Sequence, residues 1–331
     1  MLDSVHRQSW KTLYFRVGMG LCLSFLWSSG CRKQTVPTIA FIPRTSGSPL
    51  WEPAHVGAEI ASVRTGTKIY WNAPTREDDV QGQIALVESV IDRKYEGLVL
   101  APDQALALIT PVRRALSKGT PTVIIGSPLP IPAGGKLSYI LNDEEQAGRM
   151  AAVRIGELLQ GRGSVAILGI NPDVIGIMTR ARSVEASLAQ IYPWIKIVEK
   201  RLGSFNLPHD QQVAEETLRA NPDLDAIIAL TAASTRGSCS ALARNGRERS
   251  IKLVGFDEPD SLLLVQQANL DSIILQNTRE MGVRAVESIS AQLAGRPVPP
   301  ELKVPPVLMT RENQESPEIR RVLSMDWRPR P

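Results

Sequence analysis

Short apolar runs alternate with amphipathic stretches along the chain from residue 37 onward. The apolar runs are rich in Val, Ile and Leu, which is typical of strands that are buried on both faces. Between two such runs, in the segment 80–94, Ile84, Val87 and Ile91 recur at the spacing of one helix face. The alternation predicts parallel sheet covered by helices on both faces. The predicted strands are 38–42, 68–71, 97–100, 122–125, 164–168, 195–198, 226–230, 252–256 and 272–275.

About nine βα units of this kind can close into one barrel or divide into two open sheets. Length favours two lobes, because 331 residues exceed what one hydrophobic core usually organises. The alternation continues to about residue 310. The remaining segment, 312–331, is polar and carries prolines, so we predict a loose polar tail.

The N-terminal segment 1–30 has the layout of a secretory signal. Basic Arg7, Lys11 and Arg16 precede an apolar run at 17–27. That run of about 11 residues is too short to span roughly 30 Å of hydrocarbon as a helix, which disfavours a permanent transmembrane anchor.

Small residues precede a cysteine at 28–31, Ser-Ser-Gly-Cys, and this resembles the bacterial lipobox. The resemblance implies that Cys31 is diacylated and becomes the mature N-terminus, with 31–36 as a lipidated linker. The motif prefers Leu where Ser28 stands, and the alternative is an unmodified thiol at Cys31.

Composition is that of an ordinary globular protein, with 43% apolar and 22% charged residues. Part of the net charge of +4 comes from basic residues in the two terminal segments, so no basic stripe for nucleic acid is indicated. Cys22 would leave with the signal and Cys31 would carry lipid. Only Cys239 would then remain, and no disulfide framework is predicted.

Several separated segments carry a resemblance to a known family. They are 38–40 (Thr-Ile-Ala) with 48–51 (Ser-Pro-Leu-Trp), 221–227 (Asn-Pro-Asp-Leu-Asp-Ala-Ile), 254–257 (Val-Gly-Phe-Asp) and 274–276 (Ile-Leu-Gln). In this order they resemble the ribose-binding type of periplasmic sugar-binding proteins, whose ligand core is shared with lactose-repressor-type regulators.

The resemblance implies an α/β fold of two Rossmann-like lobes with parallel sheets joined by a three-strand hinge, the type I periplasmic binding protein. Ligand would lie between the lobes, at the carboxyl ends of the strands. The N-terminal lobe would take 36–141 plus 277–303. The C-terminal lobe would take 142–276 plus 304–311.

A sugar presents hydroxyls around an apolar ring face, so its site needs planar aromatic side chains and hydrogen-bonding groups at the edge. Ser48 is a candidate helix N-cap, and we also count it among the ligand-binding residues. Trp51 follows at the start of this predicted helix, and we expect its indole to point into the cleft. Phe205 resembles the family's second aromatic residue. The alternative for both rings is ordinary core packing.

Three polar residues resemble the family's contacts to sugar hydroxyls and ring oxygens: Asp257, Arg182 and Gln276. Asp257 ends an apolar strand, where a carboxylate is costly unless donors surround it. Each has an alternative interpretation. Asp257 could be the N-cap of a helix near residue 259, Arg182 could face solvent on a helix, and Gln276 could be an ordinary polar residue at a strand end.

The chain also departs from the family pattern at three strand ends, where we expect Arg44, Ser127 and Thr231 to line the cleft. Ser127 and Thr231 stand where the family usually has acidic or amide pairs, and Arg44 replaces a small polar residue. These changes remove acceptors and add a cation, which indicates negative charge or a carbonyl on the ligand. The alternative is that Arg44 pairs with a protein carboxylate in a neutral pocket.

Enzyme motifs are missing from the sequence. The histidines have no zinc-ligand spacing, and there is no P-loop or nucleophile elbow, so no metal, cofactor or catalytic residue is predicted. The acids at 143–145 are interpreted as the first turn of a helix, where they favour its dipole.

We therefore predict a substrate-binding lipoprotein of a sugar-type ABC transporter, held by lipid in the periplasm or cell envelope, with a permease as partner. The alternative is a periplasmic subunit that presents its closed form to a sensor kinase. A DNA-binding regulator is disfavoured, because a secretion signal stands where a helix-turn-helix would be needed.

Overall fold

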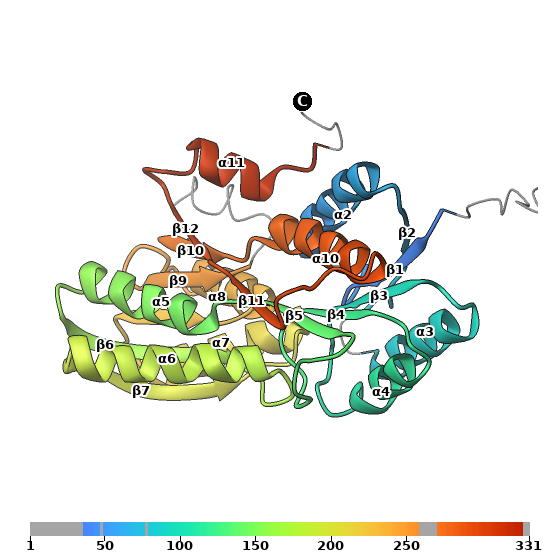
Figure 1. Cartoon of the computed structure of the whole chain (residues 1–331). Helices are drawn as coiled ribbons and strands as arrows, with labels where there is room; N and C mark the ends of the chain where they lie inside the picture. Colours follow the sequence, from blue (N-terminus) through green and yellow to red (C-terminus); the bar gives the residue numbers. More distant parts are fainter. Residues whose placement is uncertain (1–35, 47–48, 77–78, 258–269, 327–331) are drawn as a thin grey trace, which may run out of the picture. The chain divides into compact units, whose positions relative to one another are not determined.

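The computed structural model describes residues 36–46, 49–76, 79–257 and 270–326 (Figure 1). The predicted signal, Cys31 and Ser48 lie outside these residues. No helix in the described ranges combines the length and the apolar character needed to cross a bilayer.

The described strands form two six-stranded sheets rather than one barrel. The first has the order β11-β5-β4-β3-β1-β2, and all its neighbouring strands are parallel. Its strands are β1 (Thr38–Ile42), β2 (Lys68–Trp71), β3 (Gly97–Leu100), β4 (Thr122–Gly126), β5 (Leu137–Asn142) and β11 (Glu301–Val304).

The second sheet has the order β12-β10-β9-β8-β6-β7 and is parallel except where β12 pairs with β10. Its strands are β6 (Arg162–Ile170), β7 (Trp194–Leu202), β8 (Ala226–Ala229), β9 (Lys252–Phe256), β10 (Ser272–Leu275) and β12 (Val307–Thr310). We call each sheet with its helices a lobe. The chain passes between the lobes after β5, after β10 and between β11 and β12, and the predicted two-lobed α/β fold is confirmed.

Helices cover both faces of each sheet. The first lobe holds the 3-10 turn η1 (Pro49–Trp51) and the helices α2 (Glu52–Thr65), α3 (Val80–Asp92), α4 (Ile109–Ser117) and α10 (Thr278–Leu293). The second holds α5 (Glu144–Leu158), α6 (Ile175–Ile191), α7 (Leu207–Ala220) and α8 (Ala232–Arg244).

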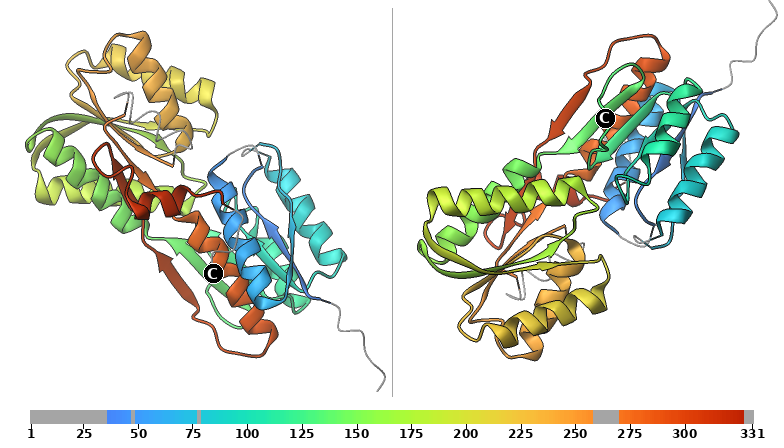
Figure 2. Two further views of the ribbon diagram at one scale, coloured as in Figure 1. Left: turned by 90° about the horizontal axis from the view of Figure 1, so that it is seen from above. Right: turned by 90° about the horizontal axis from the view of Figure 1, so that it is seen from below.

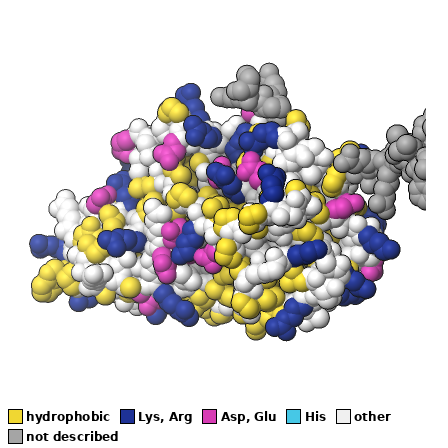
Figure 3. Space-filling model, viewed as in Figure 1, with side chains coloured by type: hydrophobic (Ala, Val, Ile, Leu, Met, Phe, Trp, Pro, Cys, Tyr) yellow, Lys and Arg dark blue, Asp and Glu magenta, His cyan; other side chains and the backbone are white. Residues whose placement is uncertain are grey.

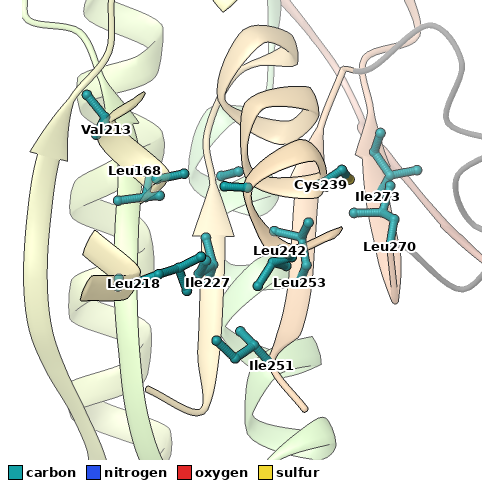
Figure 4. Packing of buried hydrophobic residues seen from close by; sticks show 14 of the residues in the cluster. Leu168, Val213, Leu218, Ile227, Cys239, Leu242, Ile251, Leu253, Leu270 and Ile273 are labelled. Carbon is teal, nitrogen blue, oxygen red and sulfur yellow. The ribbon is translucent and has the colours of Figure 1, made fainter. Parts of the chain in front are cut away.

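Each central strand sends alternate side chains into two different apolar clusters, one on each face of its sheet. In β1, Ile39 and Phe41 belong to one cluster, whereas Ala40 and Ile42 belong to the other. In the second lobe, Figure 4 shows strand residues packed against Val213 and Leu218 of α7 and Leu242 of α8. Burial on both faces explains why these strands are continuous apolar runs in the sequence.

Helices α2 and α10 lie side by side although more than two hundred residues separate them (Figure 2). A Cβ at Gly57 of α2 would overlap the carbonyl oxygen of Arg279, and one at Gly282 of α10 would overlap that of Ala54. Only glycine permits this backbone approach. The late segment of the chain thereby completes the first lobe.

The prediction of a loose polar tail was wrong for part of 312–331. Residues Pro317–Leu323 form helix α11, capped by Ser316, whose hydroxyl accepts from Ile319 N. Ile319 is 1% exposed and joins the second-lobe core with Val322. The two apolar side chains are three residues apart and share one helix face, which was too short a pattern to stand out from its polar surroundings.

Candidate functional site

The carboxyl ends of strands from both sheets meet around one cavity of about 40 Å³. Arg44 follows β1, Ser127 follows β4, and Thr231, Asp257 and Gln276 follow β8, β9 and β10. This is the position expected for ligands in parallel sheets that carry helices on both faces.

Seven of the nine residues predicted to contact ligand line this cavity. They are Arg44, Trp51, Ser127, Phe205, Thr231, Asp257 and Gln276. Ser48 lies outside the described residues, and Arg182 is elsewhere.

The prediction for Arg182 was wrong by two residues. Arg182 is exposed and lines a surface depression with Asp143 and Arg149, while Arg180 faces the cavity and is 1% exposed. Residues two apart on a helix point to nearly opposite sides. Ile177 and Val184, which are three before and four after Arg180, are both buried, and this periodicity could have identified Arg180 from the sequence.

Arg180 joins two buried carboxylates into one network. Its Nε and Nη2 donate to the two carboxylate oxygens of Glu144, at 2.6 and 3.0 Å. Its Nη1 donates to Leu230 O at 2.6 Å and to Asp257 Oδ2 at 3.2 Å. The guanidinium also lies over Phe256, 4.2 Å from the ring centroid. The two-point pairing with Glu144 suits the planar guanidinium.

Burial and charge pairing act on this network in opposite directions. Burial raises the pKa of the Glu144 carboxyl above its ordinary value, against the attraction of Arg180. Burial lowers the pKa of Arg180, but the carboxylates of Glu144 and Asp257 outweigh that effect and raise it. Arg180 is therefore a permanent buried cation.

Glu144 is a site residue that the sequence did not identify. The sequence predicted that the acids at 143–145 stabilise the start of a helix. Asp143 does so, because its Oδ1 accepts from Gln146 N and caps α5. Glu144 instead turns inward and is 8% exposed. Its buried partner comes from a helix 36 residues away, so only the tertiary structure pairs them.

Asp257 is held from three directions at the end of β9. Its carboxylate accepts from Gln276 N at 3.1 Å, from Gln276 Nε2 at 2.7 Å and from Arg180. Its φ is +57°, in the left-handed region, and so is that of Phe205. Such strain is concentrated at ligand sites, and it is more costly for a bulky Phe than for Asp. The segment near residue 259, where the sequence predicts a helix that Asp257 could cap, lies outside the described residues.

Aromatic rings from both lobes lie close to Arg44. The guanidinium carbon of Arg44 is 6.0 Å from the Trp51 ring centroid and 5.2 Å from that of Phe205. Trp51 is 3% exposed and lies against Gly126, where φ is +76° and an added Cβ would lie 3.5 Å from the indole. That distance is an ordinary van der Waals contact, so glycine is favoured at this strand end by its positive φ rather than by the space that the ring needs.

The two lobes are also joined by direct hydrogen bonds. Gly176 N of α6 donates to Ser127 Oγ at 2.9 Å, and Ala105 N donates to Asp173 O at 3.2 Å. The Thr231 hydroxyl bonds within the second lobe, where it caps α8 by accepting from Ser234 N. The described residues contain no cluster of His, Cys, Asp and Glu that could hold a metal ion.

The profile of the family described as periplasmic binding protein domain matches residues 39–297. The D-allose-binding periplasmic protein of Escherichia coli is 26% identical over 286 residues, covering 82% of this chain and 91% of the relative. The ribose import binding protein RbsB of Bacillus subtilis is 24% identical over 286 residues, covering 86% and 90%.

A solved structure of similar fold is the ABC transporter solute-binding protein of Burkholderia graminis, in complex with D-arabinose. It is 26% identical, with a TM-score of 0.78, and the match covers 85% of this chain and 97% of that one. The family and these relatives confirm the prediction of a binding protein rather than an enzyme. Two lobes closed around a cavity at their strand ends, together with a match over most of its length, show that this chain belongs to the periplasmic binding protein family.

Proposed function

We propose that this chain is the substrate-binding lipoprotein of a sugar-type ABC transporter, and that it holds a small sugar-like ligand between its lobes. The observation that carries the proposal is the pair of rings, Trp51 from the first lobe and Phe205 from the second, facing one cavity. Relatives named for allose and ribose binding support a sugar as ligand. Apolar faces of a sugar ring stack on such rings, and its hydroxyls bond to the polar groups around them.

Binding by closure follows from the distribution of these residues over both lobes. A ligand that touches both lobes stabilises only the state in which they meet. The hydrogen bonds from Gly176 to Ser127 and from Ala105 to Asp173 belong to that state and would break on opening.

We expect ligand to compact the protein without being converted. Small-angle scattering on the chain without residues 1–31 should show a smaller radius of gyration at saturating ligand, and the ligand should be recovered unchanged. Phe205→Ala should weaken binding about tenfold to a hundredfold, because stacking and burial at the second lobe are lost. Trp194→Ala is the matched control, since Trp194 is an aromatic of the same lobe that is 75% exposed. An unchanged radius with saturable binding, or chemical turnover, would contradict the proposal.

We further expect Cys31 to be the lipidated mature N-terminus, as the signal-like segment and the small residues before it indicate. Intact-mass analysis of protein extracted from membranes tests this directly. A different first residue, or Cys31 without acyl mass, would remove the lipoprotein assignment. The permease is the preferred partner, because one relative is named an import binding protein. Adjacent permease and ATPase genes would support it, and an adjacent sensor-kinase gene would support signalling instead.

A further inference from the structure

Protein groups already occupy the carboxylates that face the cavity. Both oxygens of Glu144 accept from Arg180, and Asp257 accepts from Arg180 and twice from Gln276. A neutral sugar is rich in hydroxyl donors and binds well where carboxylates accept from it. This cavity leaves little of that capacity for a ligand.

Three other donors at the cavity are, in contrast, unused. Nε of Arg44 and Nε1 of Trp51 are buried without a hydrogen-bond partner. Ser127 Oγ accepts from Gly176 N, and across the described ranges no acceptor takes its own proton. A buried donor without an acceptor is unfavourable, so these groups favour a ligand that supplies acceptors.

Arg44 is the cation that the network does not neutralise. Within the described residues no carboxylate forms an ion pair with it. Arg180 is compensated by Glu144 and Asp257. Burial raises the pKa of Glu144, and protonation of that carboxyl would make the cavity more positive. With Glu144 and Asp257 both ionised, the four charged side chains of the cavity sum to zero, but both carboxylates pair with Arg180 and neither pairs with Arg44.

We infer that the ligand of this site is a sugar acid bearing one carboxylate, and that Arg44 is the residue that selects it; the inference rests on the proposed sugar-binding function. The rings of Trp51 and Phe205 both lie within about 6 Å of the Arg44 guanidinium, and these contacts help to hold the planar donor group in the cavity. A planar carboxylate matches a guanidinium with two parallel hydrogen bonds. A carboxylate brings one negative charge to the one Arg44 guanidinium, whereas a phosphate monoester brings about −1.5 to −2 and would bury more negative charge than Arg44 can pair with.

Titration calorimetry with matched ligand pairs tests the inference. D-Glucuronate, D-galacturonate and D-ribonate are compared with D-glucose, D-galactose and D-ribose on the wild-type protein, on Arg44→Gln and on Arg44→Lys. We expect the preferred acid to bind at least about tenfold more tightly than its neutral parent, which is the effect of a charge-assisted hydrogen bond. Arg44→Gln should abolish that preference. Arg44→Lys should keep part of it, because lysine keeps the positive charge but cannot form two parallel hydrogen bonds to a carboxylate. Arg182→Gln, an exposed arginine of the second lobe, is the control and should leave the preference unchanged.

A ligand-side control keeps the test independent of how the variants fold. D-Glucuronamide keeps the shape of glucuronate without its charge and should bind as weakly as glucose, and D-glucose 6-phosphate tests the alternative anion. A neutral sugar preferred over its acid, with the lobes closing on it, would overturn the inference and leave the proposed function standing. Tighter binding of the phosphate would overturn the carboxylate assignment. Failure of every acid and every neutral sugar to bind would overturn both.

Discussion

Replacing Arg180 by Met is expected to lower the free energy of unfolding by about 3–5 kcal/mol, the cost of leaving buried charges without their partner. Glu144 and Asp257 are 8% and 4% exposed, so water cannot replace the guanidinium. The length of Met roughly fills the space, and the loss is therefore one of charge pairing rather than of volume. Urea unfolding followed by circular dichroism measures the effect.

Two further variants make this prediction specific. Arg182→Met removes an exposed arginine from the same helix and should change stability by no more than about 0.5 kcal/mol. Arg180→Met combined with Glu144→Gln should recover part of the lost free energy of unfolding, because one of the two buried carboxylates left without a partner is replaced by a neutral amide. Equal stability of Arg180→Met and Arg182→Met would contradict the network.

Gly282→Val is expected to destabilise the first lobe by about 3 kcal/mol, because a side chain there overlaps a backbone carbonyl that cannot rotate away. The overlapped oxygen is that of Ala54 in α2. The small gain in helix propensity over glycine, below about 1 kcal/mol, does not offset this overlap. Helix α2 begins directly after Trp51, and Thr278 of α10 donates to Leu50 O at 3.0 Å, so ligand affinity should fall as well.

Arg284→Ala is the control for this substitution. Arg284 lies on the same helix with its side chain 52% exposed, and its ion pairs with Glu280 and Glu287 are on the surface. Such pairs contribute roughly 0–1 kcal/mol. Unfolding of Gly282→Val at the same urea concentration as the wild type would show that the two helices can separate at no cost.

The local pattern of the chain was sufficient to predict most of the strands. All nine predicted strands coincide with strands of the structure. Seven of them are largely buried on both faces and therefore appear as apolar runs in the sequence, whereas the edge strands β2 and β7 are partly exposed. The strands that the pattern did not predict are β5, β11 and β12. In β11, exposed Glu301 and Lys303 interrupt the apolar run.

The sequence also predicted seven of the fifteen residues that line the cavity, through the family resemblance and through their positions at the ends of parallel strands, which meet at one edge of a sheet. Asp257 and Gln276 were found in this way, and the structure brings them within hydrogen-bonding distance. Arg44 and Ser127 were found by the same reasoning, as departures from the family pattern.

What only the tertiary structure decided depends on contacts between distant segments. The choice of Arg180 over Arg182 depends on which face of α6 meets the sheet, and the inward turn of Glu144 depends on that arginine. The division into two sheets and the docking of α11 likewise depend on partners far away in the chain. Hydrophobic periodicity describes how each element is buried, but it does not say against which element. The pairing of distant charges and helices is therefore decided by the tertiary structure.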